Sequence, residues 1–168
     1  MTNYLIEGPW PGQLAIVPRP RGGEWLDDEV RAWKELGCDV VVSLLTRDEL
    51  DEFGLAAEPD LSRAQGLQFC ELPIPDLGVP ESLAAARKLV DNLRSALELG
   101  KKIAIHCRQG IGRSGLIAAG VLVVSGVDPE TAIRQVSAAR GLPVPETAEQ
   151  REWVLELARD CAASLVKG

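Results

Sequence analysis

Residues 103–115 constrain the fold of this chain more than any other stretch of its sequence. An apolar, largely β-branched run ends at His106, a short loop follows with glycines at Gly110 and Gly112, and a second apolar run begins at Leu116. A buried strand, a tight turn and a helix start account for this pattern. Such a helix aims its free N–H groups and the positive end of its dipole at the loop. The segment therefore predicts an anion-binding loop at the end of a strand.

A cysteine opens this loop and an arginine closes it, with five residues between Cys107 and Arg113. The thiolate is the reactive form of cysteine, and helix N-termini and nearby cations stabilise it. Arg113 can offer two parallel N–H donors to a phosphoryl group, and Ser114 can hydrogen-bond the departing thiolate. This arrangement predicts removal of phosphate through a cysteinyl intermediate. The residues expected to surround the bound oxyanion are Arg108, Gln109, Gly110, Ile111 and Gly112, with Arg108 and Gln109 projecting their side chains outward.

Strand and helix patterns alternate along the chain. Apolar runs predict strands at 14–17, 40–45, 67–72 and 101–106, and helices are expected at 25–36, within 46–66, at 81–99, 114–125, 128–140 and after Pro145. This alternation predicts an α/β fold with a central, mostly parallel sheet of four to five strands and helices on both faces. Ligands in such sheets bind beyond the carboxyl ends of the strands, which is where Cys107 lies.

Length and charge narrow the class of protein. The chain has 168 residues, which suits one domain spanning 1–168, and a net charge of −7, which argues against nucleic acid as a partner. No apolar stretch is long enough to span a bilayer, and residues 1–10 lack the pattern of a signal peptide. We therefore expect no membrane association and a reducing, cytoplasmic setting.

The four cysteines are widely scattered, and His106 is the only histidine. Metal sites need clustered Cys and His ligands, so no metal site is predicted. A disulfide framework is not expected in a chain of this size either. Cys38 or Cys70 could form a protective disulfide with Cys107 under oxidation, although core packing explains both residues more simply.

The pattern His-Cys-x5-Arg-Ser at 106–114 resembles the signature loop of the cysteine-dependent protein tyrosine and dual-specificity phosphatases. The resemblance implies that Cys107 is the nucleophile, that Arg113 binds phosphate and that Ser114 assists departure of the thiolate. It also implies a phosphatase-like sheet flanked by helices, no metal cofactor, and phosphorylated proteins or peptides as substrates. Phosphotyrosine is the expected target, with phosphoserine and phosphothreonine as further candidates. His106 is expected to hold the loop by hydrogen bonds.

A phosphatase also needs a general acid on a loop near the nucleophile. Asp76 lies in the proline-bearing loop 73–80, about 30 residues before Cys107, and members of this family carry their acid on a loop at such a distance. An aspartate after proline is also ordinary turn chemistry. Glu71 is the second candidate, but it falls in a predicted strand. Asp76 is therefore predicted as the acid.

The segment 140–150 resembles one in Cdc14-like and kinase-associated phosphatases, in which a Thr-x-x-Gln pair brings a glutamine near the site. The resemblance implies that Gln150 positions the attacking water. Thr147-x-x-Gln150 is also the pattern of a helix capping box, and both roles are compatible. Arg140 is expected to anchor a loop rather than to touch substrate.

Two other functions remain open on the sequence alone. One is a phosphosite-binding module with little turnover, and the other is a thiol-based anion-handling enzyme of the rhodanese or arsenate reductase type. The signature loop has no lysine, and this absence makes a phosphoinositide a less favoured substrate. Arg19 and Arg21 fall in a loop that holds an acidic substrate or is simply solvated.

Overall fold

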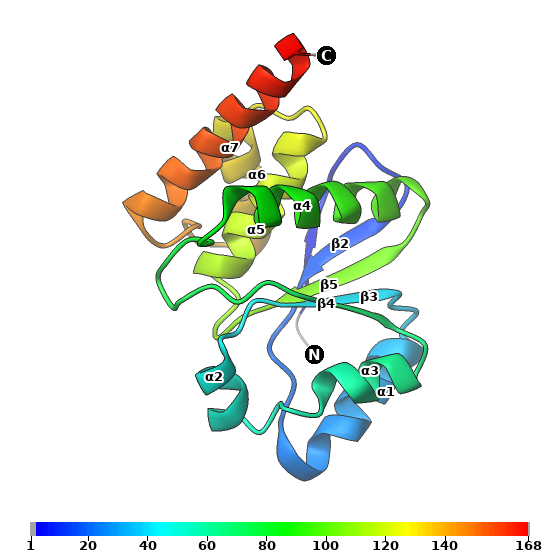
Figure 1. Ribbon diagram of the computed structural model, residues 1–168. Helices are drawn as coiled ribbons and strands as arrows, with labels where there is room; N and C mark the ends of the chain where they lie inside the picture. Colours follow the sequence, from blue (N-terminus) through cyan, green and yellow to red (C-terminus); the bar gives the residue numbers. More distant parts are fainter. Residues whose placement is uncertain (1–2, 168) are drawn as a thin grey trace.

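The computed structural model describes residues 3–167 and consists of a five-stranded sheet between two layers of helices (Figure 1). The strand Tyr4–Ile6 pairs antiparallel with the strand Gln13–Ile16, and the other neighbouring pairs are parallel. The predicted fold class is confirmed. Met1, Thr2 and Gly168, which the single-domain prediction includes, lie outside the described residues. In spatial order the strands are β1 (Tyr4–Ile6), β2 (Gln13–Ile16), β5 (Lys102–His106), β3 (Val40–Ser43) and β4 (Gln68–Glu71).

The sequence prediction missed β1 at the edge of the sheet. This strand has only three residues, and the side chain of Leu5 is 58% exposed, so no buried apolar run marks it. The last helix begins at Ala148, a few residues later than predicted, and the helix after the signature loop begins at Gly112, inside the predicted loop. The other predicted strands and helices agree with the structure to within a few residues.

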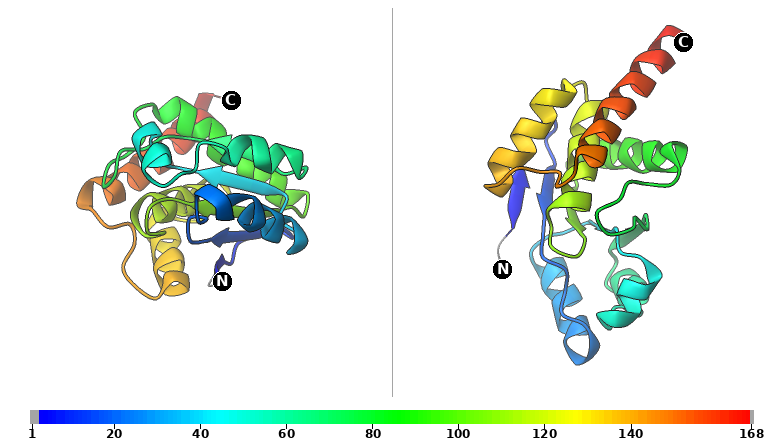
Figure 2. Two further views of the ribbon diagram at one scale, coloured as in Figure 1. Left: turned by 90° about the horizontal axis from the view of Figure 1, so that it is seen from below. Right: turned by 90° about the vertical axis from the view of Figure 1, so that its left-hand side faces the viewer.

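The helices form one layer on each face of the sheet, as the two views of Figure 2 also show. One layer contains α4 (Leu83–Glu98), α5 (Gly112–Val124), α6 (Pro129–Arg140) and α7 (Ala148–Lys167), and the other contains α1 (Leu26–Glu35), α2 (Arg47–Glu52) and α3 (Glu58–Ala64), with a short 3-10 turn at Gly23–Trp25 before α1. Helix α5 is buried from Gly112 to Val123 because it lies between the sheet and the other three helices of its layer. It therefore forms the centre of the larger hydrophobic core.

The carboxyl ends of β3, β4 and β5 meet at one edge of the sheet because the three strands run parallel. The signature loop follows β5, the segment leading into α2 follows β3, and the loop 73–80 follows β4. Three segments far apart in the sequence are thus brought to one place, at the position where ligands bind in sheets of this kind.

Replacing Leu122 by Ala should reveal how much the fold depends on the packing of α5. This side chain is fully buried, and truncating a buried leucine costs about 2–5 kcal/mol of unfolding free energy. Leu99→Ala is the matched control because Leu99 is 79% exposed, and its cost should stay below about 0.5 kcal/mol. Urea denaturation followed by circular dichroism measures both, and equal losses would contradict the central position of α5.

Candidate active site

Cys107 follows β5 directly and is only 3% exposed. The backbone N–H of Gly110 donates a hydrogen bond to its Sγ at 3.3 Å. Gly110 has a φ of 69°, a left-handed conformation that favours glycine. The thiol lines a cavity of about 180 Å³, whose walls also include Arg113 and Asp76. A small hollow with a thiol, a guanidinium and a carboxyl group therefore lies where the sequence predicted the site.

Two arginines hold the signature loop from outside. Arg140 donates from Nε to the carbonyl of Gly110 at 2.7 Å and from a terminal nitrogen to that of Gln109 at 3.2 Å. Arg19 donates to the carbonyl of Arg108 at 2.8 Å. Because the N–H of a trans peptide points opposite to its C=O, the bond of Arg140 to the Gln109 carbonyl is consistent with the Gly110 N–H pointing at the thiol. The loop is thereby shaped to surround an anion.

The guanidinium of Arg113 is held in the cavity wall by the carboxylate of Glu49. The two hydrogen bonds measure 2.7 and 2.8 Å, and a third goes to the carbonyl of Ile74 at 2.8 Å. Burial by itself would lower the pKa of Arg113, but the bonds to Glu49 and the nearby Cys107 outweigh burial and raise it. Arg113 is therefore a fixed, permanently charged donor beside the thiol.

Glu49 is a site residue that the sequence prediction missed. Its carboxylate also accepts from the backbone N–H of Thr46 at 2.9 Å, and its own N–H donates to the Thr46 hydroxyl at 3.4 Å, so the pair forms a capping box at the start of α2. Burial by itself would raise the pKa of Glu49, but the hydrogen bonds from Arg113 and from Thr46 outweigh it and lower the pKa. The Thr-x-x-Glu pattern after a predicted strand was the available signal.

Asp76 lies at the mouth of the cavity, on the loop that follows β4. Its Oδ1 is 3.3 Å from a terminal nitrogen of Arg113, and its side chain is 52% exposed. The next residue, Leu77, has a φ of 63°, a conformation that is uncommon for a residue other than glycine. The structure therefore brings the predicted acid to the predicted phosphate-binding arginine.

Gln150 is fully buried and connects the last helix to the loop that carries Asp76. Its amide donates to the carbonyl of Gly78 at 2.9 Å, and its side-chain oxygen accepts from the N–H groups of Glu146 and Thr147 at 3.1 and 3.3 Å. Its own N–H donates to the Thr147 hydroxyl at 3.1 Å, as the capping prediction requires. The side-chain amide also lies against Gly112, where a Cβ would approach it to about 3.0 Å.

His106 and Ser114 are both fully buried. The Nε2 of His106 lies 2.6 Å from a carboxylate oxygen of Glu58 in α3, and its ring stacks on Trp33 with centroids 6.0 Å apart. His106 thus connects the end of β5 to the helix layer that contains α1 and α3. Its side chain does not line the cavity. The Ser114 hydroxyl has no hydrogen-bond partner in the described part of the chain, Cys107 included.

Neither Cys38 nor Cys70 is placed to form a disulfide with Cys107. Cys70 is in β4, two strands from β5, which corresponds to about 9–10 Å and exceeds the reach of a disulfide. Cys38 precedes β3 and so lies at the opposite edge of the sheet. Burial raises the pKa of Cys38 to about 11 and also raises that of Cys70, so both are thiols at neutral pH.

Comparison with known proteins agrees with this geometry. Residues 17–127 match the family model described as "Polymorphic toxin system, DSP-PTPase phosphatase". Cyclin-dependent kinase inhibitor 3 of Sus scrofa is 32% identical over 134 residues, 79% of this chain and 63% of the relative. The putative tyrosine phosphatase 197R of Invertebrate iridescent virus 6 is 37% identical over 152 residues, 88% of this chain and 53% of the relative. The chain thus spans less than two thirds of the length of these relatives.

A solved structure has the same fold over nearly the whole chain. The kinase-associated phosphatase with its catalytic-site cysteine replaced by serine superposes with a TM-score of 0.85 at 24% identity, covering 96% of both chains. Among residues 3–167, no helix is both long and apolar enough to cross a membrane, and no group of three or more histidine, cysteine and carboxylate side chains is placed to hold a metal ion.

Replacing Glu49 by Gln should destabilise the protein in a pH-dependent way. Removing one partner of a buried ion pair costs about 3 kcal/mol. Because the folded-state pKa of Glu49 is lowered from its ordinary 4.5, its stabilisation is fully present above that pH and is lost as the pH falls through the folded-state pKa. Urea denaturation should therefore show a gap between the native protein and Glu49→Gln at pH 7 that narrows below pH 4.5.

The control is Glu52→Gln, one turn along, where an exposed carboxylate lies 3.5 Å from Arg108. Exposed pairs contribute about 0–1 kcal/mol, so this variant should track the native protein at every pH. A gap for Glu49→Gln that is constant with pH would contradict the assigned ion pair.

Proposed function

The chain belongs to the DSP-PTPase phosphatases, and from this premise we propose that it hydrolyses phosphate esters of proteins or peptides through a cysteinyl-phosphate intermediate. The observation that carries the proposal is the cavity in which Cys107, Arg113 and Asp76 meet. Phosphotyrosine is the proposed target, with phosphoserine and phosphothreonine as further candidates. The hollow, which Arg108, Gln109 and Gly112 line, has room for a phosphoryl group. Gly110 and Ile111 do not line it, and we propose that they contribute through the backbone of the loop.

In the first step, the Cys107 thiolate attacks phosphorus. The Sγ–P bond forms as the P–O bond to the leaving group breaks, and charge accumulates on the equatorial oxygens. Arg113 donates two N–H bonds to these oxygens, and the inward N–H groups of the loop stabilise them further. Because Glu49 and the outer arginines fix these donors beforehand, the groups need little rearrangement at the moment of reaction.

Asp76 supplies the proton that the leaving oxygen needs. In the second step a water attacks phosphorus, its proton returns to the Asp76 carboxylate, and the S–P bond breaks to restore the thiolate. The buried Ser114 hydroxyl, which has no partner among the described residues, is available to hydrogen-bond that thiolate as it leaves. His106 supports the loop from the opposite side through Glu58.

Gln150 is proposed first to hold the loop that carries Asp76, through its bond to Gly78. For its proposed role in positioning the attacking water, the amide nitrogen has a second N–H donor, because the bond to Gly78 uses only one of the two. The contact with Gly112 supports that role, because it keeps the side chain beside the signature loop.

The proposed phosphatase domain comprises residues 1–168, with 106–114 as the signature loop and 73–80 as the acid loop. The hydrophobic clusters on both faces of one sheet support a single unit. We propose a cytoplasmic location, because the nucleophile must remain a reduced thiol, and no metal cofactor, nucleic-acid partner or membrane partner. A phosphosite-binding module and a rhodanese- or arsenate-reductase-type enzyme are disfavoured by the presence of Asp76 beside Arg113.

The decisive measurement is hydrolysis of para-nitrophenyl phosphate by freshly reduced protein in the presence of EDTA. The native protein should hydrolyse this substrate, and the activity of Cys107→Ser should fall to background because serine has a hydroxyl in place of the nucleophilic thiolate. Cys70→Ser is the control, since Cys70 does not line the cavity, and it should keep its activity. No turnover by the native protein would refute the proposed function.

Asp76→Asn should lower kcat on a phosphotyrosine peptide by about 100-fold, which is a typical contribution of a general acid. The high-pH side of the kcat profile should also flatten, because an asparagine side chain cannot act as a general acid. Glu71→Gln is the matched control because Glu71 is the alternative acid, and its pH profile should follow that of the native protein. A profile of Asp76→Asn parallel to the native one would assign the acid elsewhere.

A further inference from the structure

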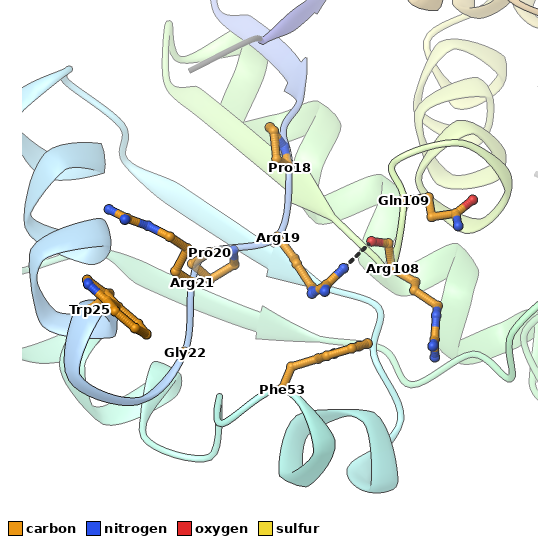
Figure 3. A pocket seen from close by; sticks show the side chains of 9 residues that line it. All are labelled: Pro18, Arg19, Pro20, Arg21, Gly22, Trp25, Phe53, Arg108 and Gln109. Carbon is orange, nitrogen blue, oxygen red and sulfur yellow. Dashed lines mark hydrogen bonds between the residues drawn. The ribbon is translucent and has the colours of Figure 1, made fainter.

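A second, larger hollow lies beside the catalytic cavity and shares Arg108 and Gln109 with it (Figure 3). Its volume is about 650 Å³, against about 180 Å³ for the catalytic cavity. The loop 18–22 after β2 forms one wall, and Trp25 and Phe53 form the others. We call this hollow the arginine pocket. Because the two hollows meet at the signature loop, a substrate whose phosphate occupies the smaller one extends naturally into the larger.

The arginine pocket gathers cations around one aromatic ring. The guanidinium carbon of Arg19 is 3.8 Å from the centroid of Phe53, and that of Arg108 is 5.1 Å from it. Figure 3 shows both side chains reaching toward this ring, with Arg19 bonded to the Arg108 carbonyl. Arg21 extends to the other side, 5.8 Å from the ring of Trp25. Cation–π contacts thus keep like charges close together.

The charge of the pocket is only partly balanced. Arg21 is paired with Glu29 at 2.7 Å, and Arg108 lies 3.5 Å from Glu52 and 3.8 Å from Glu49. Among residues 3–167, no carboxylate lies within ion-pairing distance of Arg19. The aromatic and proline walls reduce solvent around it, which strengthens its attraction for an anion. The chain as a whole has a net charge of −7, so the arginine pocket is a cationic region on an acidic protein.

We propose that the arginine pocket binds an anionic side chain of the substrate polypeptide, a carboxylate or a second phosphate, close in sequence to the phosphorylated residue. The proposal rests on the proposed phosphatase function. Guanidinium groups pair with both anions through two parallel hydrogen bonds, and Arg19 offers such a fork beside the loop. A polypeptide is favoured over an anionic membrane, because a net charge of −7 repels an extended negative surface.

The test compares matched phosphotyrosine peptides with a neutral flank, with one glutamate or with one phosphoserine, each placed in turn at the three positions on either side. At one of these positions the anionic group should lower KM by about three- to fivefold, as expected for a partly exposed ion pair. Added salt should diminish the effect. Comparison of the glutamate and phosphoserine series tells which anion the pocket takes.

Arg19→Gln should abolish this preference, whereas Arg19→Lys should retain part of it. The readout is the ratio of KM values for anionic and neutral peptides within one variant, so a change in the loop that weakens all substrates equally cancels. Arg31→Gln removes the same charge from the exposed face of α1, outside the pocket, and should preserve the ratio. A loss of the preference in Arg31→Gln equal to that in Arg19→Gln would reveal only long-range electrostatics and overturn the proposal.

Three further outcomes separate the proposals. Turnover of para-nitrophenyl phosphate without any flank preference would overturn the arginine pocket alone. If no substrate turns over, the affinities of anionic and neutral peptides for Cys107→Ser, measured by fluorescence anisotropy, still test the arginine pocket. Tighter binding of the anionic peptides that is lost on adding Arg19→Gln supports the proposal, and equal affinities overturn it. Faster turnover of phosphatidylinositol phosphate vesicles than of any peptide, lost in Arg19→Gln, would assign the pocket to a lipid headgroup and overturn the polypeptide ligand.

Discussion

The buried pair between Glu49 and Arg113 is the interaction on which the candidate site depends. It joins the start of α2 to the start of α5, and Arg113 also binds the carbonyl of Ile74 in the segment that leads to Asp76. Three segments that follow three parallel strands are thus connected by one guanidinium. Both charges are removed from water, a cost that the two short hydrogen bonds between them and the capping bonds of Glu49 offset. The arrangement fixes a cation where an anionic ligand needs it.

The signature loop illustrates how side chains outside a site determine the direction of backbone groups inside it. Arg140 and Arg19 donate to carbonyl groups on the outer side, and the Gly110 N–H, opposite the Gln109 carbonyl, faces the thiol. Gly110 supplies the left-handed turn that this path requires. Two cations that do not line the catalytic cavity therefore contribute to anion binding by holding backbone dipoles in place, which is the preorganisation that transition-state stabilisation needs.

The sequence was sufficient for four of the five strands and for the residues of the loop because both leave local patterns. Buried parallel strands are continuous apolar runs, and Cys107 and Arg113 have a fixed spacing on one loop. Glu49 and Glu58 could not be assigned a partner, since each meets the signature segment across the sheet, a contact that no local pattern records. Strand β1 was missed because a three-residue edge strand buries too little. The prediction therefore failed for long-range pairing and for one short edge strand.

The charge distribution separates two contributions to substrate choice. The net charge of −7 acts at long range and favours polypeptides with basic segments, but salt screens it beyond about 8 Å. Contacts inside the arginine pocket act at hydrogen-bond distance, where walls such as Phe53 and Trp25 exclude part of the solvent. The two contributions need not favour the same residue of a substrate. A polypeptide with an anionic group beside its phosphate and basic residues farther away would satisfy both, because each region of the protein surface then meets charge of the opposite sign.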